Sequence, residues 1–178
     1  GIYIHLLSEA LRQAGNFVVV VTSRCAEKPR IETIDNGIIY RVYDVVEIGS
    51  ERVDDLICDL CVKHQIDLIE GADHLGESAG LIGRRDRPPL NIKLHYNDVA
   101  RSLRYAHAHY RWQYGTIYLA CLRQRERISA ERRSMERADF VTAPSQAIVD
   151  AMRAEGIALP GHVPILPNPV KVCDAGTV

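Results

Sequence analysis

Apolar positions along this chain follow two alternating spacings, which predicts strands that alternate with helices. Short strand-like runs lie at residues 17–21, 66–69, 90–95, 140–143 and 163–166. Between them, apolar residues recur at helical spacing over residues 2–14, residues 50–64, a long stretch that ends at Arg137, and residues 145–155. The run at residues 140–143 has the composition of a parallel strand covered on both faces. Ser145, which follows it, is expected to cap the next helix with its hydroxyl.

One tight turn interrupts this alternation. Asn36-Gly37 is a strong hairpin dipeptide, and it joins residues 31–34 to an extended segment at residues 38–46. The remaining order of strands and helices predicts parallel pairing with right-handed crossovers. The predicted fold class is therefore α/β, a Rossmann-like three-layer domain with a mostly parallel sheet. Because the chain opens on a helix, we expect the first strand to be missing and its neighbour to have an unpaired edge.

Composition adds few constraints. The chain has 178 residues, of which 47% are apolar and 25% are charged, as in an ordinary globular domain. No apolar stretch is long enough to span a membrane, and no secretory leader is present, so we expect a cytoplasmic location. Five scattered cysteines also favour a reducing compartment. Cys58 and Cys61 have the spacing of a metal or redox pair, but their helical context favours buried thiols, and we predict no metal.

Positive charge is concentrated in one part of the chain. Residues 101–137 carry nine arginines against three glutamates, a local charge of +6. Such a segment can attract an anionic membrane surface or a nucleic acid. However, Arg127/Glu131 and Arg132/Glu136 are pairs at helical spacing, which are typical of a solvated helix face. We therefore expect no nucleic-acid partner and leave peripheral membrane contact open.

Two segments resemble a known family. Residues 137–147 (Arg-Ala-Asp-Phe-Val-Thr-Ala-Pro-Ser-Gln-Ala), followed by Leu-Pro-Asn-Pro-Val at residues 166–170, resemble the end of the N-terminal domain of family-4-type glycosyltransferases, which have the GT-B fold. Residues 1–15 and the Val-Val-Val-Val-Thr that ends at Thr22 are similar to the first helix and second strand of that domain. The resemblance implies that residues 1–170 are one half of a GT-B fold and that residues 171–178 begin a linker to an absent C-terminal domain.

Candidate site residues follow from the carboxyl ends of the predicted strands, where open α/β sheets bind ligands. His95 ends one strand, and the resemblance implies that it lies close to the reacting sugar, which makes it the catalytic candidate. A loop histidine that bonds a nearby carbonyl is the alternative. The candidates for binding the acceptor or donor are Gly1, Glu70, Asp73, Glu77, Asn97, Asp98, Ser145 and Asn168. For Asp73 a solvated acidic loop, and for Ser145 helix capping, are the simpler interpretations.

The resemblance implies the acceptor-binding half of a retaining glycosyltransferase. Its nucleotide-sugar donor would be a co-substrate held mainly by the absent C-terminal domain, and no other cofactor is expected. The acceptor would be a sugar, a small molecule or a lipid-linked molecule that offers a hydroxyl. Because transfer needs two domains that close and exclude water, we expect the isolated chain to be inactive. The alternative is a non-catalytic Rossmann-like binding or interaction module, because fold alone does not fix function.

Overall fold

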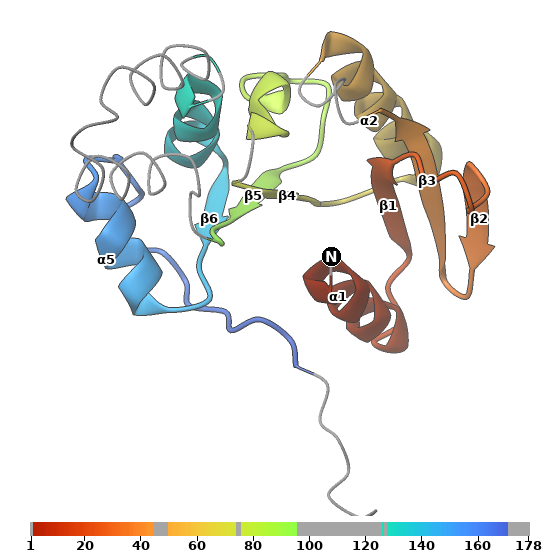
Figure 1. Cartoon of the computed structure of the whole chain (residues 1–178), viewed down its shortest axis with the longest axis horizontal. Coiled ribbons are helices and arrows are strands. Elements are labelled where there is room, and N and C mark those ends of the chain that lie inside the picture. Colours follow the sequence, from red (N-terminus) through yellow and green to blue (C-terminus); the bar gives the residue numbers. More distant parts are fainter. Residues whose placement is uncertain (1, 45–49, 74–75, 96–125, 127, 171–178) are drawn as a thin grey trace, which may run out of the picture. The chain divides into compact units, whose positions relative to one another are not determined.

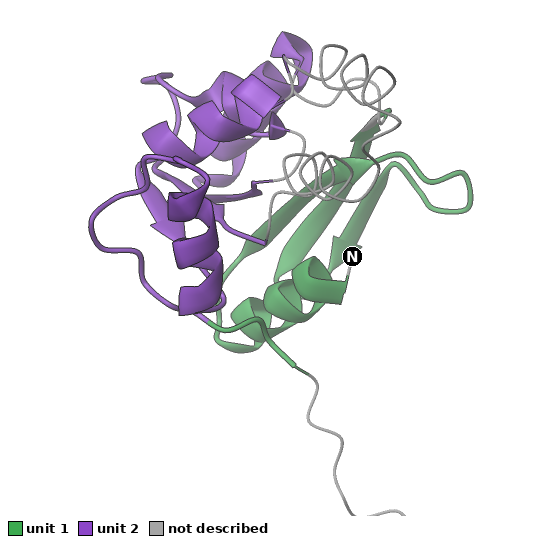
Figure 2. Ribbon diagram, turned by 60° about the vertical axis from the view of Figure 1, so that its left-hand side comes forward, with its two compact units in different colours: residues 1–46, 167–178 green, residues 47–166 purple. Residues whose placement is uncertain are grey.

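The computed structural model describes residues 2–44, 50–73, 76–95, 126 and 128–170. The chain divides into two compact units, the first made of residues 1–46 and 167–178 and the second of residues 47–166 (Figure 2). The described residues of each unit contain a three-stranded sheet. Residues 96–125 and 127, which include most of the long helical stretch predicted to end at Arg137, lie outside the described residues.

The first unit contains helix α1 (Ile2–Gln13) and strands β1 (Val18–Ser23), β2 (Ile31–Ile34) and β3 (Gly37–Tyr43) (Figure 1). Their order in the sheet is β1-β3-β2, with β1 parallel and β2 antiparallel to β3. In this sheet β1 is an edge strand, as expected.

The predicted hairpin between β2 and β3 is confirmed. Asn36 adopts a left-handed conformation, with φ 48°. At Gly37 a Cβ atom would lie 2.5 Å from the Val18 carbonyl oxygen, so the close approach of β1 to this turn requires a glycine. Asn36 and Gly37 therefore fix the hairpin by two different mechanisms.

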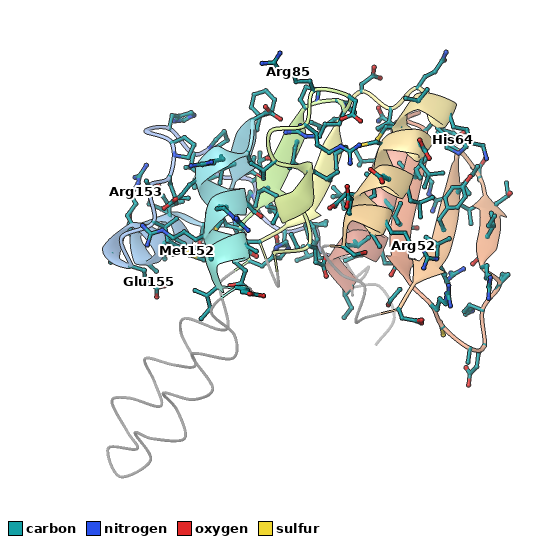
Figure 3. All side chains as sticks on the ribbon, turned by 90° about the horizontal axis from the view of Figure 1, so that it is seen from above. Arg52, His64, Arg85, Met152, Arg153 and Glu155 are labelled. Atoms are coloured by element: carbon teal, nitrogen blue, oxygen red, sulfur yellow. The ribbon has the colours of Figure 1, made fainter. Side chains whose placement is uncertain are left out.

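The second unit is built on three parallel strands in the order β4-β5-β6. In chain order it contains α2 (Glu51–His64), β4 (Ile69–Ala72), the 3-10 helix η3 (Ala79–Leu81), β5 (Leu90–Lys93), a helix at residues 128–137, β6 (Phe140–Thr142) and α5 (Gln146–Ala154) (Figure 1). Arg52 and His64 mark the two ends of α2, and Arg153 lies near the end of α5 (Figure 3). The α/β fold class predicted from the sequence is confirmed.

Three of the predicted strands differ from the observed ones. The strand expected at residues 90–95 ends at Lys93, two residues before His95. The strand expected at residues 66–69 begins only at Ile69, because α2 closes with Gln65 in a left-handed conformation and the next residues form the connection. The strand expected at residues 163–166 is a single bridge between Ala143 and Ile165. Pro164 has no amide hydrogen to donate, which prevents a longer ladder.

Apolar side chains cover one face of the β4-β5-β6 sheet. Leu90, Ile92 and Leu94 are fully buried, and they share a core with residues from α2, the helix at 128–137 and α5, which are Cys58, Met135, Val149 and Met152. Figure 3 labels Met152, which is buried in this core, beside the exposed Arg153. The predicted cover on both faces of β6 does not extend to its first residue, because Phe140 is 56% exposed.

Ser145 occupies the N-cap position of α5, as predicted, but the predicted side-chain bond is wrong. Its hydroxyl makes no cap hydrogen bond. The backbone of Ser145 has the extended conformation that is usual at an N-cap, with φ −157° and ψ 156°. Ser50 is likewise at the N-cap of α2 without a side-chain cap bond.

The thiols predicted to face the core do so. Cys58 and Cys61 are free and buried, and burial raises the pKa of the Cys61 thiol to about 11. Such a thiol is protonated at neutral pH and is a poor nucleophile or metal ligand. Among the described residues, no helix has both the length and the apolar character needed to cross a membrane.

Candidate functional site

The carboxyl ends of the three parallel strands of the second unit meet at one edge of their sheet. Ala72 of β4 pairs with Lys93 of β5, which pairs with Thr142 of β6. Asp73 follows β4 directly, and His95 lies two residues beyond the end of β5. Parallel pairing therefore brings together two of the predicted site residues from positions far apart in the sequence.

His95 is held at this edge by its backbone and by one ring nitrogen. Its amide donates to Asp73 Oδ2 over 3.0 Å, and its Nδ1 lies 3.0 Å from the Lys93 carbonyl oxygen. Asp73 Oδ1 lies 3.8 Å from the same ring nitrogen. Because a carbonyl oxygen only accepts hydrogen bonds, Nδ1 carries the proton, and in the neutral ring Nε2 retains its lone pair.

This geometry bears on the two interpretations of His95. A nearby carbonyl does engage the ring, as the alternative interpretation expects, and it does so at Nδ1. The side chain is 29% exposed. A half-buried imidazole with a fixed Nδ1 can bind a hydroxyl group through Nε2.

Asp73 is not part of a solvated loop. It is fully buried, and its amide donates to the Lys93 carbonyl oxygen over 3.3 Å. The solvated interpretation is wrong because the ends of β4 and β5 continue to pair beyond the strands, and this pairing draws the aspartate into the interior. Its carboxylate thereby reaches the backbone amide of His95.

Glu70 lies two residue pairs before this edge in the pairing of β4 with β5. It pairs with Asn91 in the register of β4 and β5, and its Oε2 accepts a hydrogen bond from Asn91 Nδ2 over 3.1 Å. Asn91 Nδ2 also lies 3.1 Å from the Thr142 hydroxyl. Glu70 is therefore part of a polar row across the sheet.

Two residues of this polar row were missed by the sequence analysis. Asn91 and Lys93 are buried, only 5% and 3% exposed, on the face of β5 opposite Leu90 and Ile92. Burial lowers the pKa of Lys93, against the influence of Glu70. The signal was the alternation of polar and apolar residues from Leu90 to Leu94, which has the period of a strand with two different faces.

The other predicted site residues are more dispersed. Ser145 is half-buried beyond the end of β6, and Glu77 is half-buried shortly before η3. Asn168 is exposed and belongs to the first unit. Gly1, Asn97 and Asp98 lie outside the described residues. In the part of the chain that the structure describes, no group of three histidine, cysteine, aspartate or glutamate residues could hold a metal ion.

Comparison with protein families gives this site its context. The sequence model of Glycosyltransferase Family 4 matches residues 1–172. The chain belongs to glycosyltransferase family 4. A comparison with curated proteins finds no match. The resemblance drawn from the two end segments is thus confirmed over almost the whole chain.

Membership of glycosyltransferase family 4 agrees with the architecture of the second unit. Its parallel sheet, with the buried aspartate and the half-buried histidine at the carboxyl edge, is the arrangement in which α/β folds bind ligands. The family establishes glycosyl transfer as the general chemistry. The division of the chain at residue 170 stays a prediction.

Proposed function

We propose that this chain is the acceptor-binding domain of a retaining glycosyltransferase that uses a nucleotide-sugar donor. The observation that carries the proposal is the placement of His95. Its backbone and Nδ1 are fixed by Asp73 and Lys93, respectively, while its side chain stays partly exposed at the ligand-binding edge of the sheet. Family membership supplies the reaction class.

In this proposal His95 acts on the sugar-transfer reaction by hydrogen bonding. Nε2 accepts a hydrogen bond from a hydroxyl group of the bound sugar and holds it close to the reacting carbon. Asp73 contributes indirectly, because its buried carboxylate fixes the backbone from which the imidazole projects. Catalytic groups act best when their own position is fixed in advance, since little ordering is then needed in the transition state.

The remaining elements of the proposal concern the partners. The nucleotide-sugar donor is bound mainly by a second domain, and the acceptor is a sugar, a small molecule or a lipid-linked molecule with a free hydroxyl. Closure of the two domains would exclude water and align donor with acceptor. We also propose a cytoplasmic location, with peripheral contact to a membrane in the case of a lipid-linked acceptor.

A transfer assay tests this function. The intact enzyme that contains this chain is incubated with a panel of nucleotide sugars and acceptors, and the release of nucleotide and the mass of the glycosylated product are measured. We expect product from the intact enzyme and none from residues 1–178 alone. Transfer by the isolated chain would contradict the two-domain proposal. Tight binding of sugars without any product by the intact protein would favour a non-catalytic binding module.

A further inference from the structure

Lys93 has an unusual place among the lysines that the structure describes. Its side chain is buried in the second unit, whereas Lys28 and Lys63 are exposed. The Lys93 ammonium donates a hydrogen bond to the carbonyl oxygen of Leu166. A buried lysine is costly unless its charge meets polar partners, so its presence at the end of the central strand needs an explanation.

The partner of Lys93 lies in the exit segment, residues 163–166, with which the chain leaves the second unit. Two backbone hydrogen bonds hold this segment to Ala143, one from the Ala143 amide to the Pro164 carbonyl and one from the Leu166 amide to the Ala143 carbonyl. The side chains of Ile165 and Leu166 are exposed. At its last residues the exit segment is therefore held by hydrogen bonds more than by apolar packing.

The backbone of Lys93 belongs to the candidate site. Its carbonyl oxygen accepts a hydrogen bond from the Asp73 amide and lies 3.0 Å from His95 Nδ1. One residue therefore contacts the His95 ring through its backbone and the exit segment through its side chain.

We propose that Lys93 is a positioning residue that fastens the exit segment to the β4-β5-β6 sheet and fixes its position relative to His95. The charge explains the choice of side chain, because a charged donor makes a stronger hydrogen bond than a neutral one. Glu70 and Asn91 lie on the same face and provide the polar surroundings that make burial of the ammonium tolerable. The role in sugar transfer rests on the proposed function, whereas the fastening itself does not.

Acylation of the folded wild-type chain tests the burial of Lys93. The chain is treated briefly with an amine-reactive acetylating reagent, and modification at each lysine is measured by peptide mass spectrometry. Lys93 is expected to react at least about 10-fold more slowly than the exposed Lys28, because its ammonium is buried and bonded. Equal rates at Lys93 and Lys28 would overturn the proposal.

Hydrogen exchange tests the fastening. Lys93→Met keeps the length of the apolar stem and removes the donor, and Lys28→Met is the matched control. In Lys93→Met the amides of Leu166 and Ala143 are expected to exchange at least about 10-fold faster, while the β5 amides keep their protection. Unchanged exchange at Leu166 would overturn the proposal. If Lys93→Met does not fold, the acylation rates of the wild-type chain decide.

Kinetics of the intact enzyme test the link to function. Lys93→Met is expected to lower kcat about 10-fold, because the exit segment is no longer held in position relative to His95. The KM for the acceptor is expected to stay unchanged, because His95 keeps its contact with the backbone carbonyl. An unchanged kcat in an active enzyme would overturn the positioning role. If the wild-type enzyme transfers no sugar, the proposed function fails, and the exchange and acylation results still decide whether Lys93 fastens the exit segment.

Discussion

Replacing Asp54 with asparagine tests the energetic cost of a buried carboxyl group on α2. Asp54 is 3% exposed, and its Oδ1 has no hydrogen-bond partner among the described residues. Burial raises the pKa of this carboxyl from 3.8 to about 6, against the positive charge of Arg84 and with the help of Asp55 and Glu51. The folded protein therefore holds this proton more tightly than the unfolded chain does.

The sign and size of the effect follow from this shift. Because the pKa of Asp54 is raised in the folded state, ionisation of the group opposes folding. The penalty is small below about pH 4, grows as the pH rises, and is complete above about pH 6. One pKa unit corresponds to about 1.4 kcal/mol, so the full penalty is about 3 kcal/mol. In Asp54→Asn the side chain at position 54 is uncharged at all of these pH values, so this variant has no such penalty as the pH rises.

Urea denaturation followed by circular dichroism at pH 4 and pH 7 measures the difference. Between these two pH values, the free energy of unfolding of Asp54→Asn is expected to rise relative to the wild type by about 2–3 kcal/mol, because a small part of the penalty is already present at pH 4. The cost of the asparagine amide itself cancels in this comparison. Asp59→Asn, an exposed position on the same helix, is the control for the loss of one charge. A difference between Asp54→Asn and wild type that is the same at both pH values would refute the reasoning.

Three further predictions concern the same unit. At Gly80 a Cβ atom would lie 1.7 Å from Asp54 Oδ2, so Gly80→Ala is expected to lower the free energy of unfolding, measured in urea, by about 1–3 kcal/mol. A second substitution, Asp54→Ala, is expected to relieve most of this loss. Strictly additive effects of the two substitutions would contradict the contact. Arg87 Nη1 lies 2.6 Å from Asp139 Oδ2, and Arg87→Met is expected to cost about 1–2 kcal/mol at pH 7 after screening by solvent. Arg87 and the Leu90 amide lower the pKa of Asp139, so the stability that the Arg87–Asp139 pair contributes should decrease as the pH falls below about 3.9. Thermal denaturation of wild type and Arg87→Met at pH 7 and pH 3 measures this decrease. An equal loss of stability in Arg87→Met at both pH values would contradict the prediction. Burial raises the pKa of the Cys61 thiol to about 11, whereas Cys25 is exposed. Iodoacetamide at pH 8 should therefore alkylate Cys25 much faster than Cys61. Equal alkylation rates in peptide mass spectrometry would contradict the burial of Cys61.

Local signals in the sequence were sufficient for most of the fold. Asn36-Gly37 predicts the hairpin because its conformation is set within the dipeptide and by one close backbone contact. The errors arose where a backbone detail decides the boundary. A left-handed Gln65 delays β4, and Pro164 limits the last predicted strand to one bridge. Neither the left-handed Gln65 nor the limit that Pro164 sets on strand pairing follows from the apolar pattern alone.

The candidate site was predictable only in part. His95 follows from its place at the end of a strand, but the burial of Asp73 depends on the pairing of β4 with β5, which brings its carboxylate to the His95 amide. Likewise, the burial of Asp54 depends on its packing against Gly80, which comes from a distant part of the chain. Lys93 has a local signal in the alternation along β5, whereas its partner Leu166 is set by the tertiary structure alone.

The most direct test of the proposed role of this site is the effect of His95 on sugar transfer. In the intact enzyme, kcat/KM for the acceptor is compared between wild type, His95→Ala and His162→Ala, an exposed histidine of the same unit. His95→Ala is expected to lower kcat/KM by about 100-fold or more with an unchanged melting temperature, and His162→Ala to have no effect. A value of kcat/KM for His95→Ala equal to that of the wild type would contradict the account.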